Sequence, residues 1–127
     1  MKPGIKGRME TIVTEAMTAK AVGSGELMVY ATPMMIALVE ETAWRSVAGE
    51  LGEGQSTVGT RMEISHISAT PVGMGVVCET ELIEIDRRKL VFSVNVCDQA
   101  GKIAEGTHER FIVDTERFME KAENKSE

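Results

Sequence analysis

The sequence has no apolar stretch long enough to cross a membrane, and its first residues lack the apolar core and cleavage site of a signal peptide. These absences predict a cytoplasmic protein with no membrane role. Basic residues are also scarce, since 14 lysines and arginines stand against 20 aspartates and glutamates and leave a formal net charge of -6. Nucleic acids and anionic membranes need a basic surface, so we expect neither as a partner.

Cysteine and histidine are too few to suggest a metal centre. The chain has two of each, and Cys78 and Cys97 lie in separate strand-like segments without CxxC spacing. This pattern favours reduced core thiols over a disulfide or a metal site. A zinc site would need more ligands than these four residues are expected to bring together. The sequence therefore implies no metal and no cofactor.

The overall composition is that of one soluble globular domain. Hydrophobic residues make up 43% of the chain and charged residues 27%, and 127 residues are enough to bury a core. We expect a single domain over residues 1–127, with loose ends at residues 1–7 and 121–127.

The longest helical pattern runs from Pro33 to about Leu51. Thr32 is expected to be the N-cap, because proline at the first helical position lacks only an N–H that has no intrahelical partner. Glu40 and Glu41 lie in the middle of the pattern among residues that look buried, and a buried carboxylate needs a partner. Apolar residues recur at spacings of three and four and predict one broad buried face: Met35, Ile36, Leu38, Val39, Ala43, Trp44, Val47 and Ala48.

Most of the remaining chain has the patterns typical of strands. Residues 8–18 predict a first strand before the helix. Everything after Ser56 is strand-like, with turns expected at residues 71–75, 86–89 and 98–101. The last strand is expected to end before a short helical turn around Phe118.

His66 lies in the first strand after the helix. Val58, Met62, Ile64 and His66 share one parity, so we expect the imidazole on the apolar side of this strand. Two interpretations stay open from the residues alone, because such a histidine is either a satisfied core residue or part of a functional site.

The order of elements is one strand, one long helix and four consecutive strands. Consecutive hairpin strands form an antiparallel sheet, and a lone helix with a wide apolar face is buried only if that sheet curls around it. The sequence thus predicts an α+β hotdog fold, an antiparallel sheet wrapped around one long central helix. Because such a sheet leaves an open edge, we expect a homodimer, with a dimer of dimers as a further option.

Three segments resemble, in this order and spacing, the fluoroacetyl-CoA thioesterase-like family of hotdog-fold thioesterases: YATPMMIALVEETA, VGTRMEISHISATPVG and EGTHERFIVDTERF. The resemblance covers nearly the whole chain after about residue 28. It implies an acyl-CoA substrate with a small or medium acyl group, and a catalytic triad of Thr32, Glu40 and His66. In such a triad the carboxylate attacks the thioester or activates water, histidine moves the proton, and threonine orients the glutamate or holds the intermediate.

The GTHER motif adds a basic residue, Arg110, which the resemblance suggests for substrate binding. Arg110 either binds the acidic part of coenzyme A or pairs with Glu109 or Asp114, and the sequence does not favour one option. His108 in the same motif is expected on the strand surface or at the dimer interface.

Further substrate-binding residues are suggested near the triad. Gly59 and Thr60 either let the substrate approach the backbone closely or form an ordinary bulge. Met34 and Met35 at the helix start are expected to line an adaptable acyl pocket, with core filling as the alternative.

The stretch AKAVGSGELMVY, between the first strand and the helix, is shorter than the aromatic-rich lid of the family's fluoroacetate-specific member. Tyr30 is its only aromatic residue. We therefore expect a general short- or medium-chain acyl-CoA thioesterase. The alternative is a noncatalytic hotdog module that binds CoA esters or another small apolar ligand. A hotdog dehydratase is disfavoured because the helix has no histidine.

Overall fold

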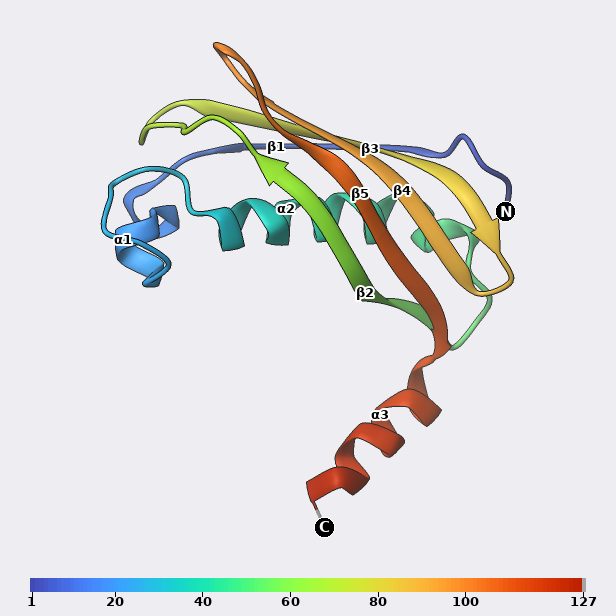
Figure 1. The fold of residues 1–127 in the computed structure, drawn as a ribbon. Coiled ribbons are helices and arrows are strands. Elements are labelled where there is room, and N and C mark those ends of the chain that lie inside the picture. The colour runs from blue at the N-terminus through green and yellow to red at the C-terminus, as the bar shows by residue number, and fades with distance from the viewer. Residues whose placement is uncertain (127) are drawn as a thin grey trace.

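The computed structural model describes residues 1–126, in which a curved antiparallel sheet wraps around one long helix (Figure 1). Its five strands lie in the order β1-β3-β4-β5-β2, and each neighbouring pair is antiparallel. The strands are β1 (Lys6–Ile12), β2 (Gln55–His66), β3 (Gly75–Asp86), β4 (Lys89–Asp98) and β5 (Gly101–Asp114). This arrangement confirms the predicted α+β hotdog architecture.

The central helix α2 (Thr32–Val47) lies across the concave face of the sheet (Figure 1). The N-cap position is Ala31 and no side chain caps the helix, so the expectation that Thr32 is the N-cap was wrong. Thr32 is instead the first helical residue, which frees its hydroxyl for another partner. The helix ends at Val47 and continues as a 3-10 turn (Ala48–Glu50).

The buried face of α2 packs against the inner face of the sheet. Its buried residues are Met35, Leu38, Val39, Thr42, Ala43 and Val47. Each large apolar side chain buried in this way contributes about 1.5–3 kcal/mol. Trp44 was expected on this face, but it is 40% exposed and the Arg45 guanidinium lies 4.9 Å from its ring centroid. The apolar face is therefore narrower than the spacing predicted.

A β-bulge in β2 decides which of its side chains face the helix. The pairing with β5 shifts between Gly59, opposite Arg110, and Arg61, opposite Glu109. An inserted residue reverses the parity of the strand. Met62, Ile64 and His66 share the inner face as predicted, but Val58 does not, because it lies opposite the exposed Phe111.

The segment between β1 and α2 is not the long first strand that was predicted. β1 ends at Ile12, and the chain then forms a 3-10 turn (Glu15–Met17) and the short helix α1 (Ala19–Val22). Thr18 begins α1 by accepting a hydrogen bond from the amide of Ala21 at 3.2 Å. Capping of this kind competes with continuation of the strand.

The C-terminal helix α3 (Thr115–Glu123) is longer than the single turn expected around Phe118. It projects away from the sheet and from α2 (Figure 1). None of its residues is buried, and Phe118 and Met119 are 41% and 47% exposed. Within residues 1–126, every helix is too short or too polar to span a membrane. The C-terminal segment that was expected to be loose, residues 121–127, includes Glu127, which lies outside the described residues.

Candidate active site

The start of α2 and the end of β2 bring two of the predicted catalytic residues together. The Thr32 hydroxyl lies 2.8 Å from Nδ1 of His66, within hydrogen-bond distance. Nε2 of His66 is buried and has no hydrogen-bond partner among the described residues. Burial lowers the pKa of His66 below its ordinary value, which keeps the imidazole neutral near pH 7. A neutral imidazole next to a hydroxyl is the arrangement that moves a proton to or from a reacting group.

A pocket of about 310 Å³ opens beside this pair. It is lined by the pair itself, by Tyr30, by small residues on either side and by residues of the loop after β2: Ala19, Ser24, Val29, Tyr30, Thr32, His66, Ile67, Ser68 and Ala69. In the first turn of α2, Pro33 has no N–H and the Met35 N–H donates to the Ala31 carbonyl at 3.0 Å, which leaves the N–H groups of Thr32 and Met34 as donors. The helix dipole favours negative charge there. A carbonyl bound in this pocket could therefore lie next to both a proton carrier and N–H donors.

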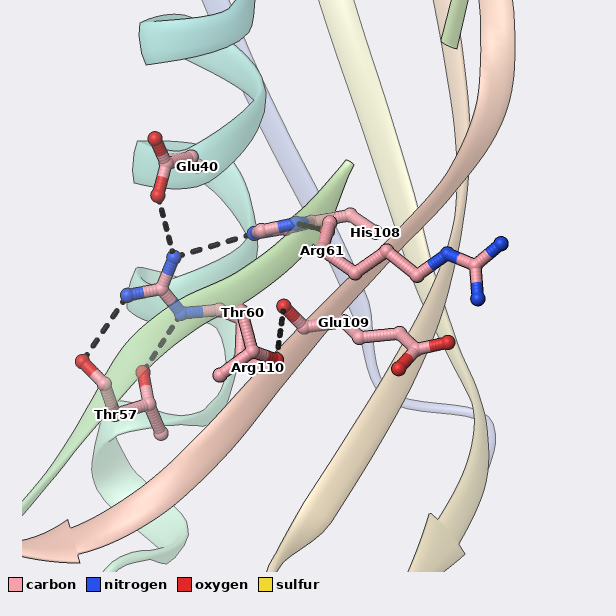
Figure 2. Close-up of polar contacts among 7 residues, drawn as sticks. All are labelled: Glu40, Thr57, Thr60, Arg61, His108, Glu109 and Arg110. Carbon is pink, nitrogen blue, oxygen red and sulfur yellow. Dashed lines mark hydrogen bonds and ion pairs between the residues drawn. The ribbon is translucent and has the colours of Figure 1, made fainter. Parts of the chain in front are cut away.

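Glu40 lies elsewhere on α2 and has a different partner. Its Oε2 accepts a hydrogen bond from Nη1 of Arg110 at 3.1 Å (Figure 2). The Glu40 side chain is 43% exposed while that of Arg110 is only 6% exposed. We expected Arg110 to bind coenzyme A or to pair with Glu109 or Asp114. The structure instead pairs it with Glu40.

The Arg110 guanidinium is held on several sides. Its Nε donates to Oγ1 of Thr57 at 2.8 Å, and its Nη2 donates to the Thr57 carbonyl at 3.0 Å. Burial lowers the pKa of Arg110, and the contact with Glu40 partly offsets this effect. An arginine stays charged in either case, so the Glu40 carboxylate compensates a cation that has almost no access to water.

His108 completes this second cluster. It is only 1% exposed, so the expectation of a strand-surface or interface position was wrong. Its Nδ1 donates to the Arg61 carbonyl at 2.8 Å, and its Nε2 lies 3.2 Å from Nη1 of Arg110 (Figure 2). Burial, and next the Arg110 charge, lower the pKa of His108. Both contacts fit the neutral imidazole with its proton on Nδ1, because the guanidinium can only donate.

Gly59 and Thr60 lie at the bulge of β2, next to this cluster. A Cβ atom on Gly59 would lie 2.5 Å from Oε2 of Glu40 and 3.3 Å from Nη1 of Arg110. The group that approaches the Gly59 backbone is thus the Glu40 carboxylate. Thr60 is exposed and its hydroxyl donates to the Glu109 carbonyl at 3.3 Å.

The two methionines at the helix start differ in position. Met35 is completely buried and belongs to the hydrophobic core. Met34 is half-buried at the edge of that core, and its carbonyl lies 3.5 Å from the Tyr30 hydroxyl. Neither methionine is among the residues that line the pocket beside Thr32.

Two polar clusters therefore lie at different positions along α2, and each combines a residue of the helix with residues of the sheet. Thr32 and His66 form the first, and Glu40, His108 and Arg110 form the second. Sequence reasoning missed the second cluster, since it sought the partner of Glu40 in His66. The signal was the GTHER motif, whose alternate residues His108 and Arg110 share one face of a strand. No group of three or more potential metal ligands lies together in residues 1–126.

Comparisons with known proteins agree with the observed fold. A fluoroacetyl-CoA thioesterase from Streptantibioticus cattleyicolor is 35% identical over 98 residues, which cover 77% of this chain and 70% of the relative. A solved structure of a fluoroacetyl-CoA thioesterase variant in complex with acetyl-CoA has a TM-score of 0.94 at 28% identity and covers 100% of both chains. A hot-dog-like protein from Thermanaerovibrio acidaminovorans, 21% identical, covers 98% of this chain and 93% of its own with a TM-score of 0.89, and shows the shared fold alone.

The fold and these relatives define a hotdog thioesterase, an enzyme that hydrolyses thioesters. The fluoroacetyl-CoA-specific thioesterase family profile matches residues 13–116. The chain belongs to this family.

Proposed function

We propose that this enzyme hydrolyses acyl-CoA thioesters that carry a small acyl group, with Thr32, Glu40 and His66 as its catalytic residues. The observation that carries the proposal is the 2.8 Å contact between the Thr32 hydroxyl and the neutral His66 imidazole at the edge of a pocket. Either Glu40 attacks the thioester carbonyl, which releases the thiolate and forms an acyl anhydride that water then hydrolyses, or Glu40 activates a water molecule that attacks the carbonyl directly. In both routes the neutral His66 imidazole accepts the proton of the attacking water and passes it to the thiolate. The first turn of α2 supplies N–H groups for the oxyanion.

Within one chain the two clusters are too far apart to act on one carbonyl carbon. Thr32 and Glu40 are eight residues apart, which is about 12 Å along a helix axis. A two-fold axis beside Ile36, midway between them, would bring Thr32 of one copy near Glu40 of another. We therefore propose a homodimer in which each site combines the Thr32–His66 pair of one chain with Glu40 of the other.

Two surfaces of the chain support a homodimer. β2 is an edge strand of 12 residues, and its outer side offers unpaired N–H and C=O groups to a second strand. The helix α3 projects away from the body of the chain and leaves Phe118 and Met119 exposed (Figure 1). Burial of these large apolar side chains against a second copy would stabilise the dimer.

The size of the acyl group is inferred from the pocket and from the relatives. The pocket beside Thr32 holds about 310 Å³ and is lined mostly by small residues. The relatives are named for fluoroacetyl-CoA, and one was solved with acetyl-CoA. We propose that acyl groups of about acetyl size fit best, and that the segment before α2, in which Tyr30 is the one aromatic residue, does not select for fluorine.

A thiol-release assay with acyl-CoA substrates of increasing length tests this function. The wild-type enzyme should hydrolyse the shortest substrates with the highest kcat/KM. Glu40→Gln should lower kcat by about 10²–10⁴-fold, because it removes the attacking or water-activating carboxylate. Glu41→Gln is the matched control, since the Glu41 carboxylate pairs with Arg45 at 2.7 Å on the exposed surface of the same helix. Tight binding of acyl-CoA without turnover by the wild-type enzyme would identify a noncatalytic binding module instead.

A further inference from the structure

His108 is a buried histidine to which the proposed reaction gives no chemical step. Its imidazole lies between three elements: the Arg61 carbonyl at the bulge of β2, the Arg110 guanidinium on β5, and the Phe92 ring on β4 at a centroid distance of 6.2 Å. Its two nitrogens have different partners, a carbonyl that can only accept and a guanidinium that can only donate. The side chain is therefore oriented by contacts at both nitrogens.

We propose that His108 is a positioning residue that aims the Arg110 guanidinium at Glu40. Nη1 of Arg110 carries two hydrogens, and its two neighbours are Nε2 of His108 at 3.2 Å and Oε2 of Glu40 at 3.1 Å. Thr57 holds the guanidinium through Nε and Nη2, and His108 adds a contact on Nη1 itself. This contact holds Nη1 from the side opposite to Thr57, so that its second hydrogen meets Oε2 of the carboxylate. Oε1 of Glu40 then stays free for the thioester or for water.

This role requires a neutral His108. A protonated imidazole would direct an N–H at the guanidinium and add a second cation beside a buried one. Burial of the ring and the charge of Arg110 on β5 lower the pKa of His108. The hydrogen bond to the Arg61 carbonyl and the charges of Glu40 on α2 and Glu109 on β5 act in the opposite direction. The inference rests on the proposed role of Glu40, because a positioning residue matters only if the group that it positions acts on substrate.

Two amide variants separate the two contacts of His108. In His108→Gln the longer side chain places an acceptor oxygen near the position of Nε2 and can still receive Arg110. In His108→Asn the shorter side chain can donate to the Arg61 carbonyl but does not reach Arg110. We expect kcat to stay within about threefold of wild type in His108→Gln and to fall about 10- to 100-fold in His108→Asn, with KM little changed in both.

Thermal midpoints of both variants, measured beside Phe92→Leu as a control for core packing, separate positioning from folding. A role confined to the bulge of β2 would give the opposite order, with His108→Asn active and His108→Gln impaired, and would overturn the proposal. Equal kcat in folded His108→Asn and wild type would also overturn it. If Glu40→Gln itself leaves hydrolysis unchanged, the proposed function has failed. If Glu40→Gln abolishes hydrolysis and His108→Asn does not lower it, only the present inference has failed.

Discussion

At the scale of single residues, the position of the Glu40 carboxylate depends on Gly59, which has no side chain. A Cβ atom on Gly59 would lie 2.5 Å from Oε2 of Glu40, which is too close, and 3.3 Å from Nη1 of Arg110. The carboxylate reaches the buried cation only across a glycine. The sequence left open whether Gly59 admits the substrate or forms an ordinary bulge. The structure places it at a bulge, and the group that approaches it is the Glu40 carboxylate.

Gly59→Ala should therefore impair catalysis more than folding. The new methyl group would displace the Glu40 carboxylate from Arg110, and a shift of about 1 Å in a reacting group can cost up to about 10²-fold in rate. Steady-state kinetics should show a kcat at least about 10-fold lower. Gly49→Ala is the control, because nothing lies within 4 Å of a Cβ atom there. Equal loss of activity in both variants would remove the explanation.

The pH dependence of hydrolysis follows from His66. Burial lowers its pKa, so the neutral form that accepts a proton persists below the ordinary histidine pKa of about 6.5. As the pH falls from 7, kcat should hold through about pH 6.5 and decline only below it. The lowered pKa of His108 has the same sign and moves the acid limb the same way. A decline that is half complete above pH 6.5 would contradict this assignment.

At the scale of elements, the pairing of β2 with β5 aligns both clusters of the site. Gly106 on β5 lies opposite Ile64, and a Cβ atom there would collide with the backbone of Glu63 and Ile64. The close approach of these two strands positions His66 at one end of β2 and the bulge near its middle. The pairing of β2 with β5 thus determines the geometry of the site and also contributes to the stability of the fold.

Gly106→Ala should lower the free energy of unfolding by at least about 2 kcal/mol, because two backbones would have to separate. Urea denaturation measures this loss. Gly101→Ala on the same strand is the matched control. Its φ of +143° is positive, as is the +159° of Gly106, but nothing lies within 4 Å of the added Cβ. Gly101→Ala should therefore lose only the backbone strain of about 1–3 kcal/mol that both variants share, and Gly106→Ala should lose more. If the two variants lose equal stability, the close approach of the strands is not the cause.

The elements and the β3–β4 and β4–β5 hairpins were largely predictable from the sequence, whereas the pairings of β1 with β3 and of β2 with β5 were not. Helical spacing after Thr32 and the turns at residues 86–89 and 98–101 gave the correct architecture, because these are local signals. The parity of β2 predicted the inward direction of His66 correctly and that of Val58 wrongly. A single inserted residue at the bulge reverses the faces to which the side chains point, and it leaves no clear local signature in the sequence.

The partner of Glu40 was hidden for a similar reason. Arg110 is 70 positions further along the chain, and only the folded sheet brings it under α2. Position singled out Thr32 and parity singled out His66, and the family resemblance then joined the two. The family resemblance grouped Glu40 with that pair, but the geometry of one chain does not.

At the scale of the whole molecule, the proposed catalytic site needs a second copy of the chain. One chain presents the Thr32–His66 pair and Glu40 about 12 Å apart along the helix. The open edge of β2 and the exposed residues Phe118 and Met119 of α3 are the surfaces proposed for the dimer. If that dimer forms, one chain can carry a substitution in the Thr32–His66 pair while the other chain carries a substitution at Glu40.

The most direct test of the composite site is complementation between His66→Ala and Glu40→Gln chains. The two variants are co-expressed with different affinity tags, and the mixed dimer is purified through both. Each homodimer should be nearly inactive. The mixed dimer should recover about half of the wild-type kcat, because one of its two sites would combine intact Thr32 and His66 from one chain with intact Glu40 from the other. A mixed dimer that forms but remains as inactive as both parents would contradict the account and place the whole site within a single chain.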